Sequence, residues 1–171
     1  MIFTSNELLA FLKDHGILAK TYEHPPVHTV EESRELRGDI PGVHTKNLFL
    51  RDAKRNFYLV VTGESTKINL KSLGPKIGAN GKLSFAAPDA LNDVLGIQPG
   101  SVSLLAAIND ADKRATVVID EALLAENPIN CHPLTNTRTT SLSKDDILAF
   151  LTATGHALHY FSSSSDGGPE T

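Results

Sequence analysis

The chain has 171 residues, of which 40% are hydrophobic and 21% charged, with one cysteine and no tryptophan. This length predicts a single domain that buries roughly 70% of its unfolded surface without covalent staples. One cysteine excludes an intrachain disulfide framework, and no apolar run reaches the roughly 20 residues that a membrane helix needs. The N-terminal stretch carries acidic residues at helical spacing and is not a signal peptide, so we expect a cytoplasmic protein.

Positive charge is concentrated in one part of the chain. The net charge of the whole chain is −4, yet residues 44–82 contain only two acidic residues, Asp52 and Glu64. The eight cations of this segment are Lys46, Arg51, Lys54, Arg55, Lys67, Lys71, Lys76 and Lys82. Such segregation is typical of a phosphate-binding face, and a solvated surface without a partner produces the same pattern.

Capping patterns mark the first helices. Thr4 and Glu7 form a capping box that predicts a helix over residues 4–15. The same pattern recurs further on and predicts a second helix over residues 29–36. Between them, the run over residues 17–24 predicts a strand, which two prolines end because they lack amide donors.

The rest of the chain alternates between strands and short helices. Residues 67–78 predict a helix that Gly74 and Pro75 weaken or break, Pro88 begins a helix to about residue 95, and Ser143 caps one to about residue 154. Apolar runs bounded by turn residues predict strands at 46–52, 56–63, 82–86, 102–109, 115–120, 129–134, 139–142 and 156–161.

Because strands outnumber helices and short turns join many neighbours, we predict an α+β fold. The expected architecture is one compact domain over residues 1–161, built on a mixed, largely antiparallel β-sheet flanked by helices. Residues 162–171 lack the apolar surface needed to order themselves, so we expect a disordered C-terminal tail.

Few residues indicate chemistry on their own. The spacings of phosphate loops, dinucleotide sites, zinc proteases and CxxC motifs are absent, and we expect neither a metal nor a cofactor. Cys131 is interpreted as a small buried hydrophobe, because adjacent strand residues face opposite ways and it cannot form a dyad with His132. His132 is either satisfied by backbone partners or faces a pocket.

The turn around Pro99 and Gly100 allows two interpretations as well. It is either a plain connection from a helix to a strand or a loop that presents backbone N–H groups to an anion or an oxyanion.

Three segments in order resemble the YbaK/prolyl-tRNA-synthetase-associated editing domains, most closely the freestanding ProX-type deacylases. These segments are "HTKNLFLRD", "KLSFAAPDALNDVLGIQPGSVSLLAAIND" and "NPINCHPLTNTRTTSLSKDDILAFLTATGH". The resemblance runs from about residue 21 to residue 161. It implies a compact α+β fold with a curved mixed sheet, no metal, and hydrolysis of a mischarged aminoacyl ester on tRNA. In the ProX branch the substrate is alanine attached to proline tRNA.

The resemblance also implies a set of site residues. The essential lysine of the family falls on Lys46 and its neighbour on Asn47. The glycine of the GxxxP loop falls on Gly100, and the last position of that loop is Leu104 instead of proline. We therefore expect Lys46 and Gly100 in catalysis, with Lys46 holding the terminal phosphate or ribose and the amides from Gly100 onward holding the carbonyl. The expected substrate-binding residues are Asn47, Ser101, Ser103 and His132.

Physical chemistry is consistent with this function. A pocket sized for proline admits a smaller amino acid, because the missing methylenes are worth only ~1–3 kcal/mol each, so a second site must remove the error. Two alternatives stay open: removal of another amino acid, such as cysteine, from proline tRNA, and a non-catalytic nucleic-acid-binding module. The expected partner is the acceptor end of mischarged tRNA. The sequence leaves delivery by prolyl-tRNA synthetase and a homodimer open, and indicates no membrane.

Overall fold

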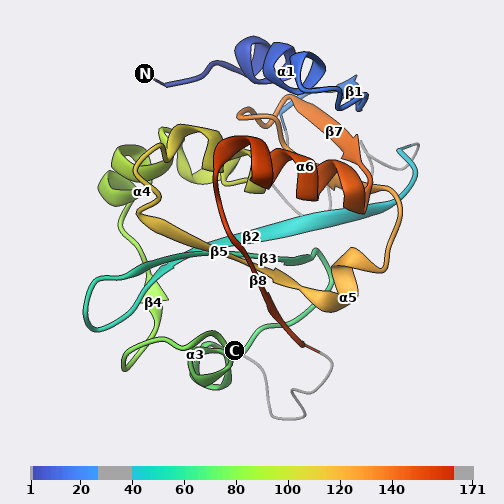
Figure 1. Cartoon of the computed structure of the whole chain (residues 1–171). Coiled ribbons are helices and arrows are strands. Elements are labelled where there is room, and N and C mark those ends of the chain that lie inside the picture. The colour runs from blue at the N-terminus through green and yellow to red at the C-terminus, as the bar shows by residue number, and fades with distance from the viewer. Residues whose placement is uncertain (1, 27–39, 164–171) are drawn as a thin grey trace.

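The computed structural model describes residues 2–26 and 40–163. A mixed β-sheet forms the middle layer, with α1, α4 and α6 on one face and α3 on the other (Figure 1). The helix predicted over residues 29–36 lies outside the described residues. The helical elements are α1 (Ser5–Asp14), α3 (Leu70–Ile77), α4 (Pro88–Leu95), η1 (Pro99–Ser101), η2 (Leu104–Asn109), α5 (Glu121–Leu124) and α6 (Lys144–Thr154).

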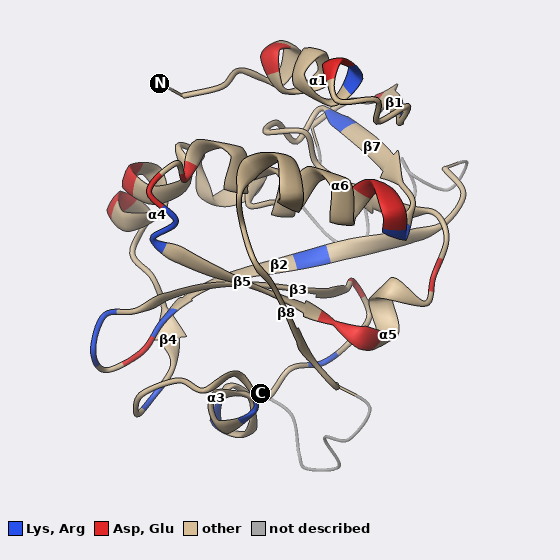
Figure 2. Cartoon of the chain, in the orientation of Figure 1, with Lys and Arg blue, Asp and Glu red and all other residues tan. Residues whose placement is uncertain are grey.

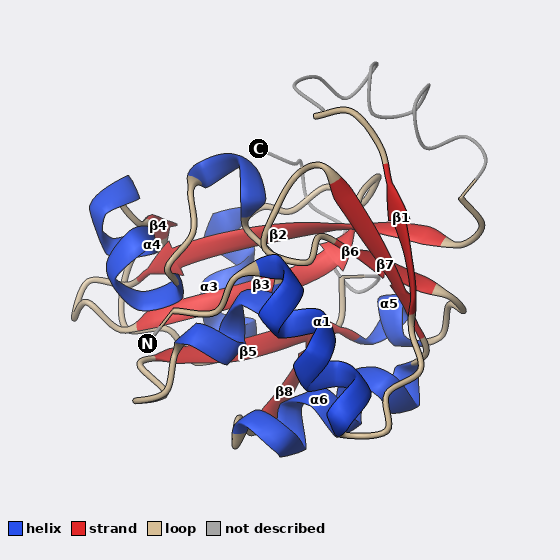
Figure 3. Ribbon diagram, turned by 90° about the horizontal axis from the view of Figure 1, so that it is seen from above, coloured by secondary structure: helices blue, strands red, loops and turns tan. Residues whose placement is uncertain are grey.

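The sheet is mixed, as predicted, and its strands run in the order β1-β7-β6-β2-β3-β5-β8, with β4 pairing with β2 off this path. Four pairings are antiparallel and three are parallel, the parallel ones being β2–β6, β3–β5 and β5–β8. Seen from above, β1 and β7 run across the direction of β2 and β3 (Figure 3). The strands are β1 (Lys20–Glu23), β2 (Val43–Arg51), β3 (Phe57–Gly63), β4 (Ser84–Phe85), β5 (Ala115–Asp120), β6 (Ile129–Cys131), β7 (Arg138–Leu142) and β8 (Leu158–Phe161).

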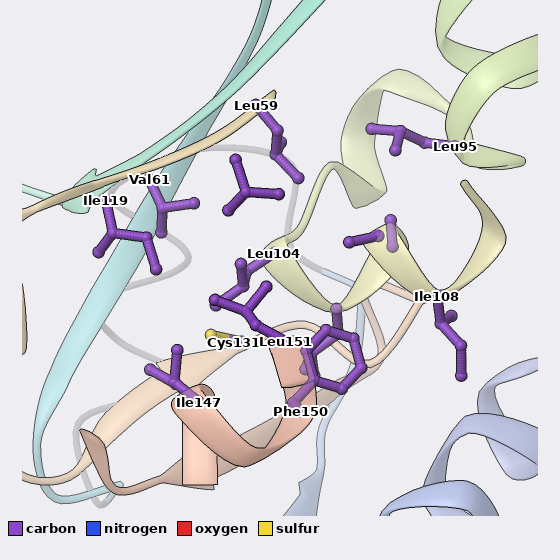
Figure 4. Packing of buried hydrophobic residues seen from close by; sticks show 14 of the residues in the cluster. Leu59, Val61, Leu95, Leu104, Ile108, Ile119, Cys131, Ile147, Phe150 and Leu151 are labelled. Atoms are coloured by element: carbon purple, nitrogen blue, oxygen red, sulfur yellow. The ribbon is translucent and has the colours of Figure 1, made fainter. Parts of the chain in front are cut away.

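Alternation along the strands divides the apolar side chains between two cores. Phe49 of β2 and Val61 of β3 belong to the larger core, under α1, α4 and α6, where Leu104 and Phe150 are fully buried (Figure 4). Leu50 of β2 faces the other way and packs in a smaller core with Leu73 of α3. The face to which a β2 residue points therefore decides which core or surface its side chain meets.

Several element predictions were wrong in type or extent. The apolar run 102–109 is not a strand: residues 104–109 form the 3₁₀ helix η2, whose N-cap is Ser103. A short helix that is buried on every side is apolar throughout, so its sequence shows no periodicity that distinguishes it from a buried strand. The strand predicted over 129–134 ends at Cys131, and α5 was not predicted.

Pro75 does not break its helix. It lies inside α3, which runs on to Ile77 and ends at Gly78 in the left-handed conformation. Most of the predicted disordered tail lies outside the described residues. Its first two residues are described and are held by the domain: the Ser162 carbonyl accepts from Lys76 Nζ at 3.0 Å, and Ser163 Oγ donates to Asp120 Oδ2 at 2.5 Å.

Asp52 joins two surface loops through a buried carboxylate. It follows β2 and is only 3% exposed. It accepts hydrogen bonds from the backbone N–H groups of Lys54, Asn56 and Asn80, each at 2.9 Å. Burial alone would raise the pKa of Asp52, but the hydrogen bonds from Asn80 and Asn56 outweigh it and hold the pKa well below its usual value. The turn between β2 and β3 is thereby fastened to the loop that follows α3.

This carboxylate predicts a specific loss of stability in acid. A depressed carboxyl pKa contributes stability above the unfolded pKa, about 3.9, and that stability is lost as the pH falls through the folded value. We expect Asp52→Asn to lower the urea midpoint at pH 7, because an amide nitrogen then faces N–H donors. At pH 3 the difference in midpoint between the variant and the unsubstituted chain should be smaller. Asp112→Asn, at an exposed position, is the control and should leave the midpoint unchanged. A deficit of equal size at both pH values would contradict this role.

Candidate functional site

The two polar neighbours in β2, Lys46 and Asn47, point to opposite faces of the sheet. Asn47 shares its face with Phe49 and the larger core, whereas Lys46 shares its face with Leu48 and Leu50 on the side of α3. Both residues are half-buried and lie in the interior of the strand, which begins at Val43. A ligand that contacts both side chains must therefore pass around an edge of β2.

β2 offers such an edge. On the side away from β3 it pairs with β6 at Val43 and His44, and with β4 at Leu50 and Arg51. Next to this pairing, the Phe49 carbonyl accepts a hydrogen bond from the Ala86 N–H at 3.0 Å. Within the described ranges, no strand pairs with residues 45–48 on that side, and we call these residues the open edge of β2. By the rise of an extended strand it is about 10 Å long.

Hydrogen bonds fix the orientation of the Asn47 amide at this edge. The Thr45 hydroxyl donates to the Asn130 carbonyl at 2.8 Å, so toward Asn47 its oxygen can only accept. Asn47 Nδ2 donates to that oxygen at 3.4 Å. Asn47 Oδ1 is buried and has no hydrogen-bond partner in the described structure. A buried amide oxygen without a donor is costly, and this oxygen has no exposed surface through which a ligand could supply one.

A hollow of about 220 Å³ lies beside Asn47. Its walls include Phe49 of β2, Phe85 of β4, and Pro99 and Val102 around η1. The walls are mainly apolar, and the Asn47 amide supplies a polar group. The hollow is thus suited to a small ligand group with an apolar part and one hydrogen-bond donor.

The loop around η1 lies at this hollow and next to the loop that follows β6. A Cβ built on Gly100 would lie 4.0 Å from Asn136 Nδ2, with nothing closer. Gly100 is exposed and Ser101 half-buried. The Ser101 N–H donates to the Gln98 carbonyl at 2.9 Å, so it is already occupied and is not a donor for an oxyanion. The structure thus brings Asn47, Gly100 and the loop after His132 together.

Ser103 has a structural place beneath this loop. It is fully buried, and its hydroxyl accepts from the Leu105 N–H at 3.1 Å as the N-cap of η2. Its side chain therefore has no exposed surface to offer a substrate. Leu104, where the family has proline, is the first residue of η2 and is fully buried. Proline suits that first helical position, so the two residues can hold the loop in the same way.

His132 leads into the loop after β6, and its ring is held by a backbone carbonyl. Its Nδ1 lies 3.0 Å from the Arg138 carbonyl oxygen, which can only accept, so this nitrogen carries a proton. The His24 ring, which the sequence did not single out, lies 6.4 Å from the His132 ring between centroids. His24 Nε2 lies 2.8 Å from Thr139 Oγ1. The sequence did not predict that His24 and His132 lie near each other, because the two residues are far apart along the chain.

Lys46 is anchored on the opposite face. Its Nζ donates to the Thr66 carbonyl, in the segment that leads into α3. Its cross-strand neighbour Thr62 donates to Asp120 Oδ2 at 2.8 Å, which places a fixed carboxylate one strand further on. The lysine is therefore a held cation at the surface and not part of either core.

Cys131 has the place predicted for it. It is 1% exposed in the larger core, and burial raises the pKa of its thiol to about 12. It is therefore a neutral buried side chain at physiological pH and not a nucleophile.

The chain matches the family model described as "Aminoacyl-tRNA editing domain" over residues 24–150. It is 42% identical over 152 residues to the prolyl-tRNA editing protein ProX of Acetoanaerobium sticklandii, covering 87% of this chain and 91% of that protein. The chain belongs to the aminoacyl-tRNA editing domain family. The resemblance inferred from the three segments is thereby confirmed.

Other relatives agree with this membership. The prolyl-tRNA synthetase associated domain-containing protein 1 of Danio rerio is 38% identical over 152 residues, covering 88% of this chain and 82% of that protein. A solved structure, described as a candidate trans-editing enzyme for prolyl tRNA synthetase, superposes with a TM-score of 0.70 at 19% identity. It covers 95% of this chain and 99% of that one, and it supports the fold. In the described ranges, no helix has both the length and the apolar character to span a membrane.

Measurements of stability can test whether the Ser103 hydroxyl anchors η2. Ser103→Ala removes an N-cap, so we expect the free energy of unfolding to fall by about 1 kcal/mol. Ser101→Ala, in the same loop but without a cap, should change it by less than about 0.5 kcal/mol. Urea unfolding measures both variants. Equal stabilities would show that the Ser103 hydroxyl does not anchor η2.

Proposed function

We propose that this protein is a trans-editing deacylase that hydrolyses the ester of alanine wrongly attached to proline tRNA. The observation that carries the proposal is the hollow of about 220 Å³ that Asn47 lines between β2, β4 and the loop around η1. The family membership supports hydrolysis of an aminoacyl-tRNA, and the names of the relatives support proline tRNA as the carrier.

The hollow and Asn47 would bind the aminoacyl group. Asn47, a neutral amide on the lining of the hollow, provides the polar contact beside the α-ammonium group of the substrate. The small side chain lies against the apolar walls formed by Phe49 and Val102. Selection in this proposal is by size, with the methyl group of alanine accepted against these walls and larger side chains excluded.

The reaction needs positioning more than a strong base, because an aminoacyl ester is already activated. Water adds to the ester carbonyl, and the negative charge that develops on its oxygen is held by backbone amides of the loop that Gly100 begins. The bond to the terminal ribose oxygen then breaks, the acid leaves, and the proton from water passes to that oxygen. The adjacent ribose hydroxyl of the substrate assists this transfer.

Lys46 would hold the nucleic acid. An ordinary lysine has a pKa near ~10.4 and is charged at neutral pH, so it is a poor general base and a good partner for phosphate. It lies on the α3 side of the sheet, opposite Asn47. The substrate therefore bends around the open edge of β2, with the terminal nucleotide on one face and the aminoacyl group on the other. His132, held by the Arg138 carbonyl, orders the loop beside the hollow.

The proposal is tested by incubating the purified protein with proline tRNA that carries alanine, cysteine or proline, and following the loss of each ester. We expect alanine to be removed fastest. If cysteine is removed fastest, the protein acts on the other mischarged species. If no ester is lost above the spontaneous rate while tRNA still binds, the protein is a nucleic-acid-binding module and the proposal fails.

The role of Lys46 gives a separate prediction. Lys46→Ala should reduce kcat/KM for the alanyl ester at least tenfold, about 1.4 kcal/mol of transition-state stabilisation, because the phosphate contact is lost. Unfolding by urea should change little, since the side chain is half-buried outside both cores. Lys144→Ala, at an exposed position of α6, is the control. Retention of near-full activity by Lys46→Ala would refute its role.

A further inference from the structure

A second, larger cavity lies along α3, on the same face of the sheet as Lys46. Its volume is about 830 Å³, and its walls come from α3 and the loop that follows. Leu70, Pro75 and Leu83 provide an apolar floor, and Lys71 and Lys82 are exposed cations on its lining. We call this cavity the α3 groove. The site at the open edge of β2 does not use it.

The charged residues that line the α3 groove, among those the structure describes, are the cations Lys71 and Lys82. Within residues 44–82 the two acidic residues are Asp52, which is buried, and Glu64, which is half-buried. Figure 2 shows cations on the β2–β3 turn and around α3, whereas acidic residues gather on α4, α5 and the start of α6. The cations of residues 44–82 thus gather on the surface formed by the β2–β3 turn and the surroundings of α3. Such a surface attracts a polyanion.

The loop that carries Lys82 is held in place. The Ala53 N–H donates to the Asn80 carbonyl at 2.9 Å, and the Asn80 N–H donates to Asp52 Oδ2 at 2.9 Å. Gly81 has φ +78°, and a Cβ there would lie 2.9 Å from Ala53 Cβ, so only glycine permits this approach. Lys82 therefore projects from a loop whose backbone is fixed before any ligand arrives, which lowers the entropy cost of binding.

The α3 groove also continues from the site. Lys46 is anchored to the Thr66 carbonyl, and Thr66 precedes Lys71 by five residues, so at most roughly 18 Å of chain separates them. A nucleic acid whose terminal nucleotide meets Lys46 therefore has its next nucleotides within reach of the groove. The amino acid, on the other side of the open edge, does not enter it.

We propose that the α3 groove binds the sugar–phosphate backbone of the acceptor arm of the tRNA substrate. The inference rests on the proposed function. Lys71 and Lys82 pair with phosphates as point charges, and the apolar floor covers the faces of the sugars between them. Lys76 has another task, because its Nζ donates to the Ser162 carbonyl.

Binding of uncharged proline tRNA to Lys71→Gln/Lys82→Gln, measured over a series of salt concentrations, tests the proposal. Each lost phosphate contact makes the negative slope of log affinity against log salt shallower by about 0.7–0.9. The slope of the double variant should therefore be shallower by about 1.4–1.8. Lys13→Gln/Lys144→Gln makes the same charge change on α1 and α6 and should retain the original slope. Equal slopes in the two double variants would overturn the proposal.

Hydrolysis separates this inference from the proposed function. The unsubstituted chain and both double variants are assayed with alanyl-tRNA(Pro) and with the alanyl ester of adenosine 5′-monophosphate, a short ester that carries the terminal nucleotide alone and does not enter the groove. We expect Lys71→Gln/Lys82→Gln to raise KM at least tenfold for the tRNA and to leave the short ester unaffected. An unchanged KM for the tRNA would refute the groove. If the unsubstituted chain hydrolyses neither ester but the slope difference persists, the proposed function fails and the RNA surface stands.

Discussion

The split pairing of β2 is the constraint on which the rest of the structure depends. β6 pairs with its first residues and β4 with its last, so the open edge between them has a strand on one side only. A continuous partner strand would cover the Asn47 backbone and close the route between the two faces of the sheet. The parallel register of β2 with β6 places Asn130 opposite His44, so the chain enters the loop after Cys131 at the start of the open edge. The position of His132 is therefore a consequence of strand pairing.

Buried polar groups hold the loops that surround this edge. Ser103 caps η2 and thereby fixes the loop at Gly100, and Asp52 fastens the β2–β3 turn to the loop before β4. Asp120 accepts from Thr62 and Ser163 and holds Ser163 on the α3 side. Each group is fully partnered, so its burial does not carry the cost of an unsatisfied atom. Asn47 Oδ1 differs from them because it is buried without a donor in the described structure.

Much of the fold could be predicted from the sequence because its signals are local. The capping boxes at Thr4 and Ser143, and Pro88 at the start of α4, mark three helices whose ends agree with prediction within about a residue. The run at Leu104 could not be assigned correctly, because five consecutive buried residues show neither helical nor strand periodicity. Its identity depends on tertiary burial, which no local pattern records.

The site was harder to predict from the sequence than the fold. Adjacency in the sequence does not show which side chains lie on the same face of a sheet. "KN" suggests two groups acting on one atom, but alternation places Lys46 and Asn47 on opposite faces. His24 and Asn136 are far apart in the chain, yet His24 lies near His132 and Asn136 lies near Gly100. This separation has a chemical advantage. A cation next to the aminoacyl group would repel its α-ammonium, whereas a cation behind the strand attracts the phosphates and leaves the hollow to a neutral amide. In the proposed function, the sheet therefore separates recognition of the nucleic acid from recognition of the amino acid.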